Sequence, residues 1–564
     1  MTTMDSGVGV ATVAEHEWPF TDDVTESFTT RVRYALEKQR AIYQEPVAAA
    51  ERVLADILAQ TTDTEFGREF GLRWVRDMTD WRKAVPIQQY EDIRPYVDRA
   101  MAGRDAVLTV DRPYAFLRTS GSSGTPKYIP TTRHWRDRYR GSALYAQWGL
   151  YFEAMRRVGT HPPDVLDLSW ERSDVAGPRP DYSISSRPAA VSARDWLPPW
   201  YGESWFLAEP GEDWRSGLYR KLRLMASRNV RAIVALNPSK IISLAETLAG
   251  AGELLIRDLI DGTLDGRRRP DVFADREVAD RLRAAQRRGP LRLRDLWPDL
   301  AVVVSWNSAS AALYENWLES VLPGVPRLPF SATGTEGIVT IPVDDHPSAG
   351  PLAVNQGVFE FVPNDEADSV APDAATLDFT ELEVGGEYRL VMSQANGLLR
   401  YDIGDVYTVS GRYGATPRLE FSGRAGFRSS FTGEKLTEVQ VHQAVSDAFP
   451  RQHGIPPLFT FVPEWGAPPR YRVVLQGPIP FDSGRFAQDV DDALRRINIE
   501  YGEKRRSERL GAVRAVVVEP DAFSRIEEHR RANGASSAQI KHHWLQRDDA
   551  LLTTLRDLRL ILVD

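Results

Sequence analysis

The stretch Thr119-Ser120-Gly121-Ser122-Ser123-Gly124-Thr125-Pro126-Lys127 is the strongest local signal in the sequence. It follows the apolar residues 114–117, which are expected to form a strand. Its two glycines allow close backbone approach to a ligand, and its hydroxyls and successive N–H groups can surround an anion. Lys127 adds a positive charge, so the stretch suits a polyphosphate, although it lacks the residue order of a Walker A loop. The candidate binding residues are Ser120, Gly121, Ser122, Ser123, Gly124, Thr125 and Lys127.

Length, charge and composition exclude several classes of protein. The chain has 564 residues, which predicts more than one domain. Its 70 Lys and Arg against 79 Asp and Glu give a net charge of −9, which argues against a nucleic-acid partner. It has no cysteine, so disulfides, thiolate catalysis and cysteine-ligated metals are excluded. With no signal-peptide pattern in residues 1–22 and no apolar run of about 20 residues, we expect a cytoplasmic protein without a membrane partner.

Hydrophobic periodicity predicts an α/β fold. Short β-rich runs alternate with helical patterns in the first part of the chain, which favours a parallel or mixed sheet flanked by helices. From about 348 to 421 the expected strands are closely spaced with glycine turns, which indicates an antiparallel barrel or sheet, and a smaller α+β unit follows. The expected strands are 106–110, 114–117, 231–236, 301–305, 357–362, 387–391, 406–409 and 419–421, and the expected helices include 241–259 and 310–322.

Further motifs in a fixed order accompany the glycine- and hydroxyl-rich stretch. They are Thr64-Glu65-Phe66-Gly67, Val85-Pro86-Ile87-Gln88-Gln89-Tyr90-Glu91, Leu296-Trp297-Pro298-Asp299-Leu300 and Gly397-Leu398-Leu399-Arg400-Tyr401-Asp402-Ile403-Gly404-Asp405. Together they resemble the acyl-acid amido synthetases, a family of acyl-adenylate-forming enzymes. The resemblance runs from about residue 52 to 541. It implies a large N-terminal domain (1–424) with a β-barrel subdomain at about 348–421, and a small mobile C-terminal domain (425–564).

The resemblance also gives roles to Thr333-Gly334-Thr335-Glu336-Gly337. It assigns Glu336 to Mg²⁺, a metal that prefers carboxylate and phosphate oxygens, and Thr335 to the phosphate or the acyl carboxylate. Relatives carry an aromatic residue a few positions before the Glu that stacks on adenine. That place is taken by Ala332 here, so either Phe330 supplies the stacking or the adenine face is built differently.

Two more residues are assigned to the nucleotide by the same resemblance. Asp405 suits the ribose, because one carboxylate accepts hydrogen bonds from both hydroxyls of a vicinal diol. Arg424 lies where the family joins its two domains and is expected to contact ribose or phosphate. Ala425 and Gly426 follow it, where many relatives carry an acidic residue.

The C-terminal stretch Gly534-Ala535-Ser536-Ser537-Ala538-Gln539-Ile540-Lys541 resembles the family's terminal signature. In the family this lysine swings over the nucleotide, where its charge can stabilise the transition state of adenylation. Lys541 is therefore the candidate catalytic residue. His542, His543 and Trp544 follow it in place of the usual Pro and Arg, and two adjacent histidines alone do not make a metal site.

These assignments predict a ligase that uses ATP and Mg²⁺. It would convert a carboxylic acid into acyl-AMP and pass the acyl group to an amine, expected to be an amino acid, where the resemblance supplies the amide product. The alternatives are an acyl-CoA synthetase and a nucleotide-binding protein without turnover. The acid itself is not readable, and Trp170, Tyr182, Trp200 and Trp306 are either pocket residues or core packing. Asn498 and Tyr501 match a family pattern and are expected to help the small domain pack.

Overall fold

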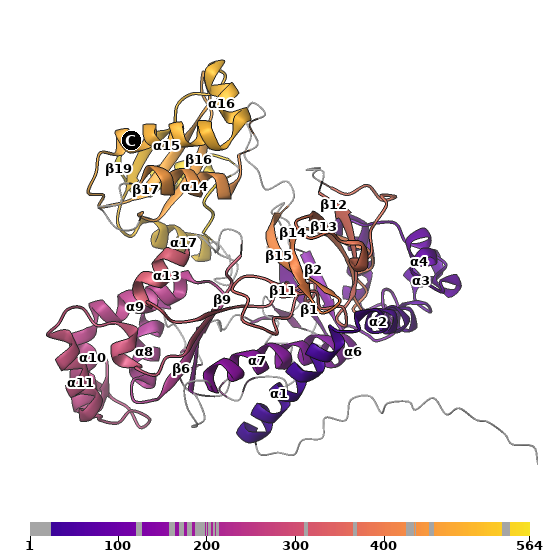
Figure 1. Ribbon diagram of the computed structural model, residues 1–564, viewed down its shortest axis with the longest axis horizontal. Helices are drawn as coiled ribbons and strands as arrows, with labels where there is room; N and C mark the ends of the chain where they lie inside the picture. The colour runs from indigo at the N-terminus through magenta and orange to yellow at the C-terminus, as the bar shows by residue number, and fades with distance from the viewer. Residues whose placement is uncertain are drawn as a thin grey trace, which may run out of the picture.

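A computed structural model gives the arrangement of the chain (Figure 1). The described residues are 24–119, 127–156, 164–168, 174–176, 183–185, 198, 200, 203, 205–206, 209, 214–308, 314–364, 369–424, 434, 436–449, 456–532, 542–546 and 548–564. Figure 1 shows a large unit and, above its helices α9 (Ser239–Gly250) and α13 (Glu315–Val321), the unit formed by the C-terminal part of the chain.

Helices at the N-terminal end build one wall of the large unit. Thr64 and Asp77 begin two of them by accepting hydrogen bonds from backbone N–H groups of the first turn. Apolar residues on one face of the second helix, including Val53 and Ile57, are buried in a hydrophobic core that also contains residues of the third and fifth helices. The five helices are α1 (Val24–Ile42), α2 (Pro46–Thr61), α3 (Glu65–Glu69), α4 (Met78–Ala84) and α5 (Tyr90–Met101).

Two four-stranded sheets follow. In the first, with order β2-β1-β5-β4, β1 is antiparallel to β2 and parallel to β5. The second, with order β10-β9-β6-β3, is parallel throughout, and its central strands are entirely buried, as expected for a sheet covered on both faces. The strands are β1 (Ala115–Thr119), β2 (Lys127–Thr131), β3 (Asp164–Asp167), β4 (Asp174–Ala176), β5 (Ser183–Ser185), β6 (Val230–Ala235), β9 (Val302–Ser305) and β10 (Arg327–Pro329).

Further helices and a short hairpin complete the large unit. Helix α7 packs along α1, and α8, α9 and α10 contact one another beside the sheet (Figure 1). These elements are α6 (Arg133–Trp135), the π-helical turn η2 (Arg136–Arg140), α7 (Gly141–Arg156), α8 (Trp214–Met225), α10 (Gly252–Asp261), β7 (Thr263–Leu264), β8 (Arg267–Arg268), α11 (Arg276–Gln286) and α12 (Leu293–Leu296).

An antiparallel sheet with order β11-β15-β14-β13-β12 occupies the region expected to be a β-barrel. Among the described residues β11 and β12 are its two edges, so it is an open sheet rather than a closed barrel. Bulges within β13–β14 and β14–β15 add local twist without closing it. Its strands are β11 (Gly350–Pro351), β12 (Val358–Pro363), β13 (Glu387–Ser393), β14 (Tyr401–Tyr413) and β15 (Thr416–Arg424).

The C-terminal unit is α+β, as the sequence indicated. Its sheet has the order β16-β17-β18-β19, with one parallel pair in the middle. Asn498 caps a helix and donates to the Glu434 carbonyl, and the buried Tyr501 donates to Asp491, so both residues hold this unit together. The elements are α14 (Glu438–Ala448), β16 (Phe459–Glu464), β17 (Arg470–Gln476), α15 (Ser483–Ile497), α16 (Ile499–Arg506), β18 (Arg514–Val518), α17 (Ala522–Ala532), α18 (Ala550–Asp557) and β19 (Ile561–Val563).

One expected strand is absent. Residues 106–110 are apolar, yet Ala106 has a φ of 49°, and the carbonyls of Ala106 and Val107 accept from the first N–H groups of α3, those of Glu65 and Phe66. The carbonyls of this segment therefore accept from N–H groups that have no partner within helix α3, instead of pairing with a strand. Similarly, the helix expected at 241–259 divides at Ala251, which ends α9 and begins α10.

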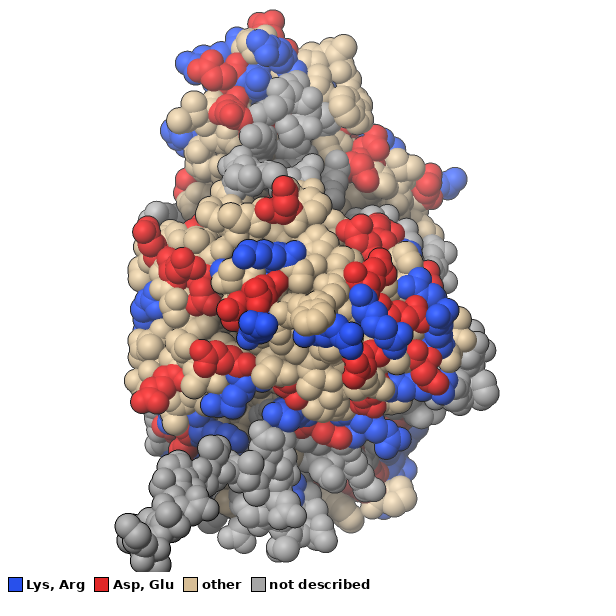
Figure 2. Space-filling view, turned by 90° about the vertical axis from the view of Figure 1, so that its right-hand side faces the viewer, with Lys and Arg blue, Asp and Glu red and all other residues tan. Residues whose placement is uncertain are grey.

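On the surface shown in Figure 2, Lys and Arg are mixed with Asp and Glu, and neither positive nor negative charge dominates this face. Arg94 with Glu91 and Arg99 with Glu65 are ion pairs of the N-terminal helices. Among the described residues, every helix is too short or too polar to cross a membrane.

Candidate nucleotide site

The glycine- and hydroxyl-rich stretch connects two paired strands. Thr119 ends β1, Lys127 begins β2, and the two residues are partners across the antiparallel ladder. Between them, Ser120, Gly121, Ser122, Ser123, Gly124 and Thr125 lie outside the described residues. The described flanks, Thr119 and Lys127, therefore lie opposite each other where β1 ends and β2 begins.

Lys127 lies close to two tyrosine rings. Its Nζ donates to the hydroxyl of Tyr401 at 3.0 Å, and the same nitrogen is 5.6 Å from the ring centres of Tyr90 and Tyr401. Tyr401 belongs to the Tyr-Asp-Ile-Gly-Asp motif, 274 residues further along the chain. Two of the sequence-predicted motifs thus meet at this ammonium group.

Tyr90 also fixes the backbone immediately after Lys127. Its hydroxyl accepts from the N–H of Tyr128 at 2.6 Å and donates to the carbonyl of the same residue at 3.1 Å. Burial raises the pKa of Tyr90 to about 12, so the phenol stays protonated and can make both bonds. A third hydrogen bond holds the same strand, because the Asn396 side chain donates to the Pro130 carbonyl at 3.1 Å.

The motif of Thr335 and Glu336 is a tight turn. The N–H of Gly334 donates to the carbonyl of Gly337 at 2.9 Å, and Thr333 pairs with Ile338 as an isolated bridge, so Thr335 and Glu336 occupy the two corners. Thr335 donates its hydroxyl proton to Oε2 of Glu336 at 2.9 Å. Both side chains are partly exposed.

The turn contacts the segment that follows β2 through Arg140, a residue that sequence reasoning missed. Both terminal nitrogens of Arg140 donate to the Gly334 carbonyl, at 3.1 and 3.2 Å. Trp135, whose ring lies 5.3 Å from the same guanidinium, donates its Nε1 proton to Gln394 at 3.1 Å. These contacts span 194 and 259 residues of sequence, so no local pattern could have indicated them.

Asp405 and Arg424 stand opposite each other on neighbouring strands. They are partners in the β14–β15 ladder, and the Asp405 side chain is partly exposed. Asp402, three residues earlier, is buried, accepts from Arg389 at 2.7 and 2.9 Å, and accepts from the N–H of Gly404 at 2.9 Å. This buried ion pair fixes the bend at Gly404, whose φ is 77°. The bend in turn sets the direction of the Asp405 side chain.

The two candidates for adenine stacking differ in exposure. Ala332 is buried, and its N–H donates to Thr340. Phe330 is only partly buried where it packs against the large core. Phe330 is therefore the better candidate of the two.

Lys541 lies outside the described residues, but the residues after it do not. His542 bonds to the Phe459 carbonyl at 2.7 Å, and Nδ1 of His543 is 3.6 Å from Glu438. Trp544 is buried in the core of the C-terminal unit. The described residues contain no cluster of three potential metal-ligating side chains.

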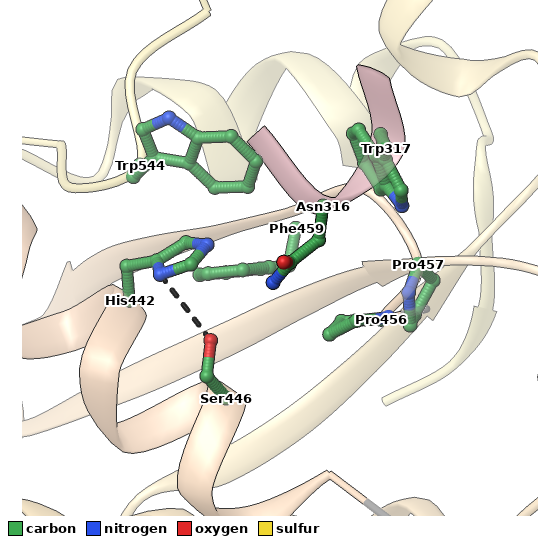
Figure 3. Close-up of a pocket in the computed structure, with 8 residues that line it drawn as sticks. All are labelled: Asn316, Trp317, His442, Ser446, Pro456, Pro457, Phe459 and Trp544. Atoms are coloured by element: carbon green, nitrogen blue, oxygen red, sulfur yellow. Dashed lines mark hydrogen bonds between the residues drawn. The ribbon is translucent and has the colours of Figure 1, made fainter. Parts of the chain in front are cut away.

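A pocket lies between α13 and the C-terminal unit (Figure 3). Trp317 faces Trp544 and Phe459 across it, and His442 points toward Ser446, with which it forms a hydrogen bond of 3.3 Å. No residue predicted to bind the nucleotide lines it. The lining residues are Asn316, Trp317, His442, Ser446, Pro456, Pro457, Phe459 and Trp544.

Of the four aromatic residues considered for the acyl pocket, two lie among the described residues. Trp200 packs in the core, with its ring centre 4.9 Å from that of Trp148, and Trp306 packs against Phe421 at 5.6 Å. Both therefore contribute to packing. Trp170 and Tyr182 lie outside the described residues.

Models of one protein family match most of the chain. Sequence models of the GH3 family match in chain order: the N-terminal domain at residues 35–327, the central domain at 350–424 and the C-terminal domain at 439–550. The chain belongs to the GH3 family. It is an acyl acid amido synthetase of the adenylate-forming superfamily, an ATP-dependent ligase, and this confirms the prediction from its motifs.

Relatives and solved structures agree with this GH3 assignment. An indole-3-acetic acid-amido synthetase of Oryza sativa subsp. indica is 28% identical and covers 88% of this chain and 87% of its own. An indole-3-acetic acid-amido synthetase of Arabidopsis thaliana is 24% identical, with 87% of each chain covered. The structure of the AtGH3.15 acyl acid amido synthetase in complex with 2,4-DB has a TM-score of 0.79 at 19% identity, covering 95% of this chain and 97% of its own, which confirms the α/β fold.

Proposed function

We propose that this GH3 protein joins a small carboxylic acid to an amino acid in two steps at one site. The acid oxygen attacks the α-phosphorus of ATP and pyrophosphate leaves, giving acyl-AMP. The amino group then attacks the acyl carbon and AMP leaves, with one proton released to solvent. The relatives named as indole-3-acetic acid-amido synthetases make arylacetic acids the first acids to test.

Each part of ATP has a candidate partner. Lys127 and the stretch Ser120–Thr125 are proposed to hold the phosphates, Asp405 the ribose, and Arg424 the ribose or a phosphate. Thr335 is proposed to contact a phosphate or the acyl carboxylate, and Lys541 to stabilise the charge that develops in adenylation. The contact Lys127–Tyr401 supports this, because it joins the described parts of two separate motifs, and the contact Arg140–Gly334 joins the third motif to the segment that follows β2.

Mg²⁺ fits the chemistry of Glu336. The carboxylate is partly exposed and accepts from Thr335, and in the described part of the chain no Lys, Arg or His lies within 4 Å of it. A carboxylate with open oxygens beside a phosphate site is how Mg²⁺ is commonly bound. When bound, the ion would neutralise phosphate charge. A cytoplasmic location and the absence of nucleic-acid and membrane partners stay predictions from the sequence.

The ordered match of all three GH3 domain models carries this proposal. Acid-dependent exchange of pyrophosphate into ATP tests the first step across a panel of arylacetic, benzoic and aliphatic acids. Mass analysis of products made with amino acids or with CoA tests the second. An amide in the amino-acid reactions is expected. A CoA thioester as the sole product, or no exchange with any acid, would contradict the proposal.

A further inference from the structure

The chain forms an unusual turn directly after the β1–β2 hairpin. Residues Arg136–Arg140 make one π-helical turn between α6 and α7. Such turns contain an extra residue, change the direction of the side chains that follow, and often occur at functional sites. Arg136 and Arg138 of this turn make ion pairs with Asp137 and Asp56.

Arg140, the last residue of the turn, is different because it is buried. Its exposed fraction is 7%, and no carboxylate of the described residues lies within 4 Å of its nitrogens. Burial lowers the pKa of Arg140 to about 10, and the charge of Glu336 opposes that shift. A guanidinium removed from water needs strong hydrogen bonds, and the ones it makes are to the Gly334 carbonyl.

The Gly334 carbonyl controls the geometry of the Thr335–Glu336 turn. Gly334 closes the turn through its N–H, so its peptide groups are held on both sides. A β-carbon built at Gly334 would lie 2.6 Å from Oε2 of Glu336, which shows how closely that carboxylate follows the backbone of Gly334. Displacing the Gly334 carbonyl would therefore move the Glu336 carboxylate as well.

We propose that Arg140 is a positioning residue for the metal-bound nucleotide: by holding the Gly334 carbonyl with two N–H groups, it aims the Glu336 carboxylate at Mg²⁺. The inference rests on the assignment of Glu336 to Mg²⁺ under the proposed function. Trp135 takes part by stacking on the guanidinium while its own N–H is held by Gln394. The segment that leaves the phosphate-binding stretch thus also orients the metal-binding turn.

Calorimetric titration of the full-length protein with ATP tests this without an acid and without turnover. Titrations run at a series of MgCl₂ concentrations, and in EDTA, give the apparent affinity for Mg²⁺ and the affinity for metal-free ATP. In Arg140→Gln the apparent Mg²⁺ affinity is expected to fall about tenfold, the usual effect of losing a group that orients a metal ligand. Metal-free ATP binding is expected to change less than about twofold, since Arg140 does not touch the nucleotide in this scheme.

Arg138→Gln is the matched control, because it removes the same charge from the same turn but from a side chain paired with Asp56. It is expected to keep the wild-type affinity for Mg²⁺. Arg140→Lys serves where the Gln variant does not fold, since it keeps the charge but cannot place two N–H groups in a fork on one carbonyl. A several-fold loss is expected for it, and wild-type Mg²⁺ affinity in a folded Arg140→Gln or Arg140→Lys protein overturns the inference.

Glu336→Gln, titrated in parallel, separates this inference from the proposal beneath it. If Glu336→Gln loses Mg²⁺ affinity and the Arg140 variants do not, the role of Arg140 is wrong and the metal assignment stands. If Glu336→Gln itself keeps the wild-type affinity, the metal assignment fails and the positioning role fails with it. An equal loss of metal-free ATP binding in Arg140→Gln would also overturn the role, because it would indicate damage to the whole site.

Discussion

The ammonium group of Lys127 donates a hydrogen bond of 3.0 Å to the phenol of Tyr401. One residue ends the glycine- and hydroxyl-rich stretch, and the other begins the strand that carries Asp405. The contact therefore links Lys127, a candidate for phosphate binding, to the strand that carries Asp405, the candidate for ribose binding. The ring centre of Tyr90 is 5.6 Å from the same ammonium, so Lys127 contacts tyrosines from two distant parts of the chain.

Tyr401→Phe is therefore expected to weaken ATP binding while the protein stays folded. The ring remains, but the oxygen that accepts from Lys127 is lost, and a hydrogen bond to a charged group contributes about 1.5–3 kcal/mol. The KM for ATP in pyrophosphate exchange should rise about tenfold, with a smaller effect on kcat. Tyr413→Phe, in the same strand, should leave the KM for ATP at its wild-type value, because Tyr413 packs against Tyr43 instead. An unchanged KM in Tyr401→Phe would remove Tyr401 from this role.

Much of the fold could be predicted from the sequence because the signals are local. The strands near 231–236, 301–305 and 387–391 appear as β6, β9 and β13 within two residues of the expected ends, since each is a short run of apolar and β-branched residues. The run at 106–110 has the same character but forms no strand. Its carbonyls satisfy the first turn of a helix forty residues earlier in sequence, and that pairing has no local signal.

In the candidate site, too, the residues with a local sequence signal were predicted and those without one were not. Glu336 and Asp405 were predicted because short motifs carry them. Arg140, Trp135 and Gln394 were missed, since an arginine, a tryptophan and a glutamine far apart in sequence acquire a meaning only when the fold brings them together. The sequence left open whether residues 348–421 form an antiparallel barrel or a sheet for a similar reason: closure depends on whether the edge strands meet, which strand spacing does not reveal.

Removing the buried carboxylate that pairs with Arg400 should destabilise the large unit. Glu360 is fully buried and accepts from Arg400 at 2.9 and 3.0 Å. Glu360→Gln leaves the Arg400 guanidinium without its counter-charge, which is expected to cost about 3–5 kcal/mol of unfolding free energy. Urea unfolding monitored by tryptophan fluorescence measures the loss. As a comparison, Glu503→Gln removes one partner of an exposed pair with Arg506 and should cost less than about 1 kcal/mol. Equal effects of the two substitutions would contradict the argument.

Acid should destabilise the junction at which His442 lies. Burial lowers the pKa of His442 to about 4, below its ordinary value of 6.5. The folded state therefore prefers the neutral ring, so its stabilising contribution is complete above pH 6.5 and is lost as the pH falls toward 4. The free energy of unfolding of the wild-type protein minus that of His442→Gln, measured at intervals from pH 7.5 to 4.5, should decrease across this window. A difference that stays constant with pH would show that His442 is not the responsible group.

Replacing Lys541 should separate binding from chemistry. In the family that the C-terminal motif resembles, this lysine swings over the nucleotide and stabilises the charge that develops in adenylation, so Lys541→Ala should bind ATP within about threefold of wild type but exchange pyrophosphate at least about a hundredfold more slowly. Lys504→Ala, on the surface helix α16, is a suitable control. Wild-type exchange in the Lys541→Ala protein would exclude the catalytic assignment.

Asp405 can be tested with nucleotides that lack one ribose hydroxyl. A carboxylate that accepts from the ribose loses a hydrogen bond with 2′-deoxy-ATP or 3′-deoxy-ATP, so wild-type protein should bind at least one of these analogues about five- to tenfold more weakly than ATP. In Asp405→Ala the acceptor is already absent, and the same analogue should bind about as well as ATP does. The comparison between nucleotides within one variant cancels any general damage to the site, including loss of the Asp405 charge opposite Arg424 in the ladder. If the analogue penalty persists undiminished in Asp405→Ala, the ribose is held by another group, and Asp405 instead serves the pairing of β14 with β15.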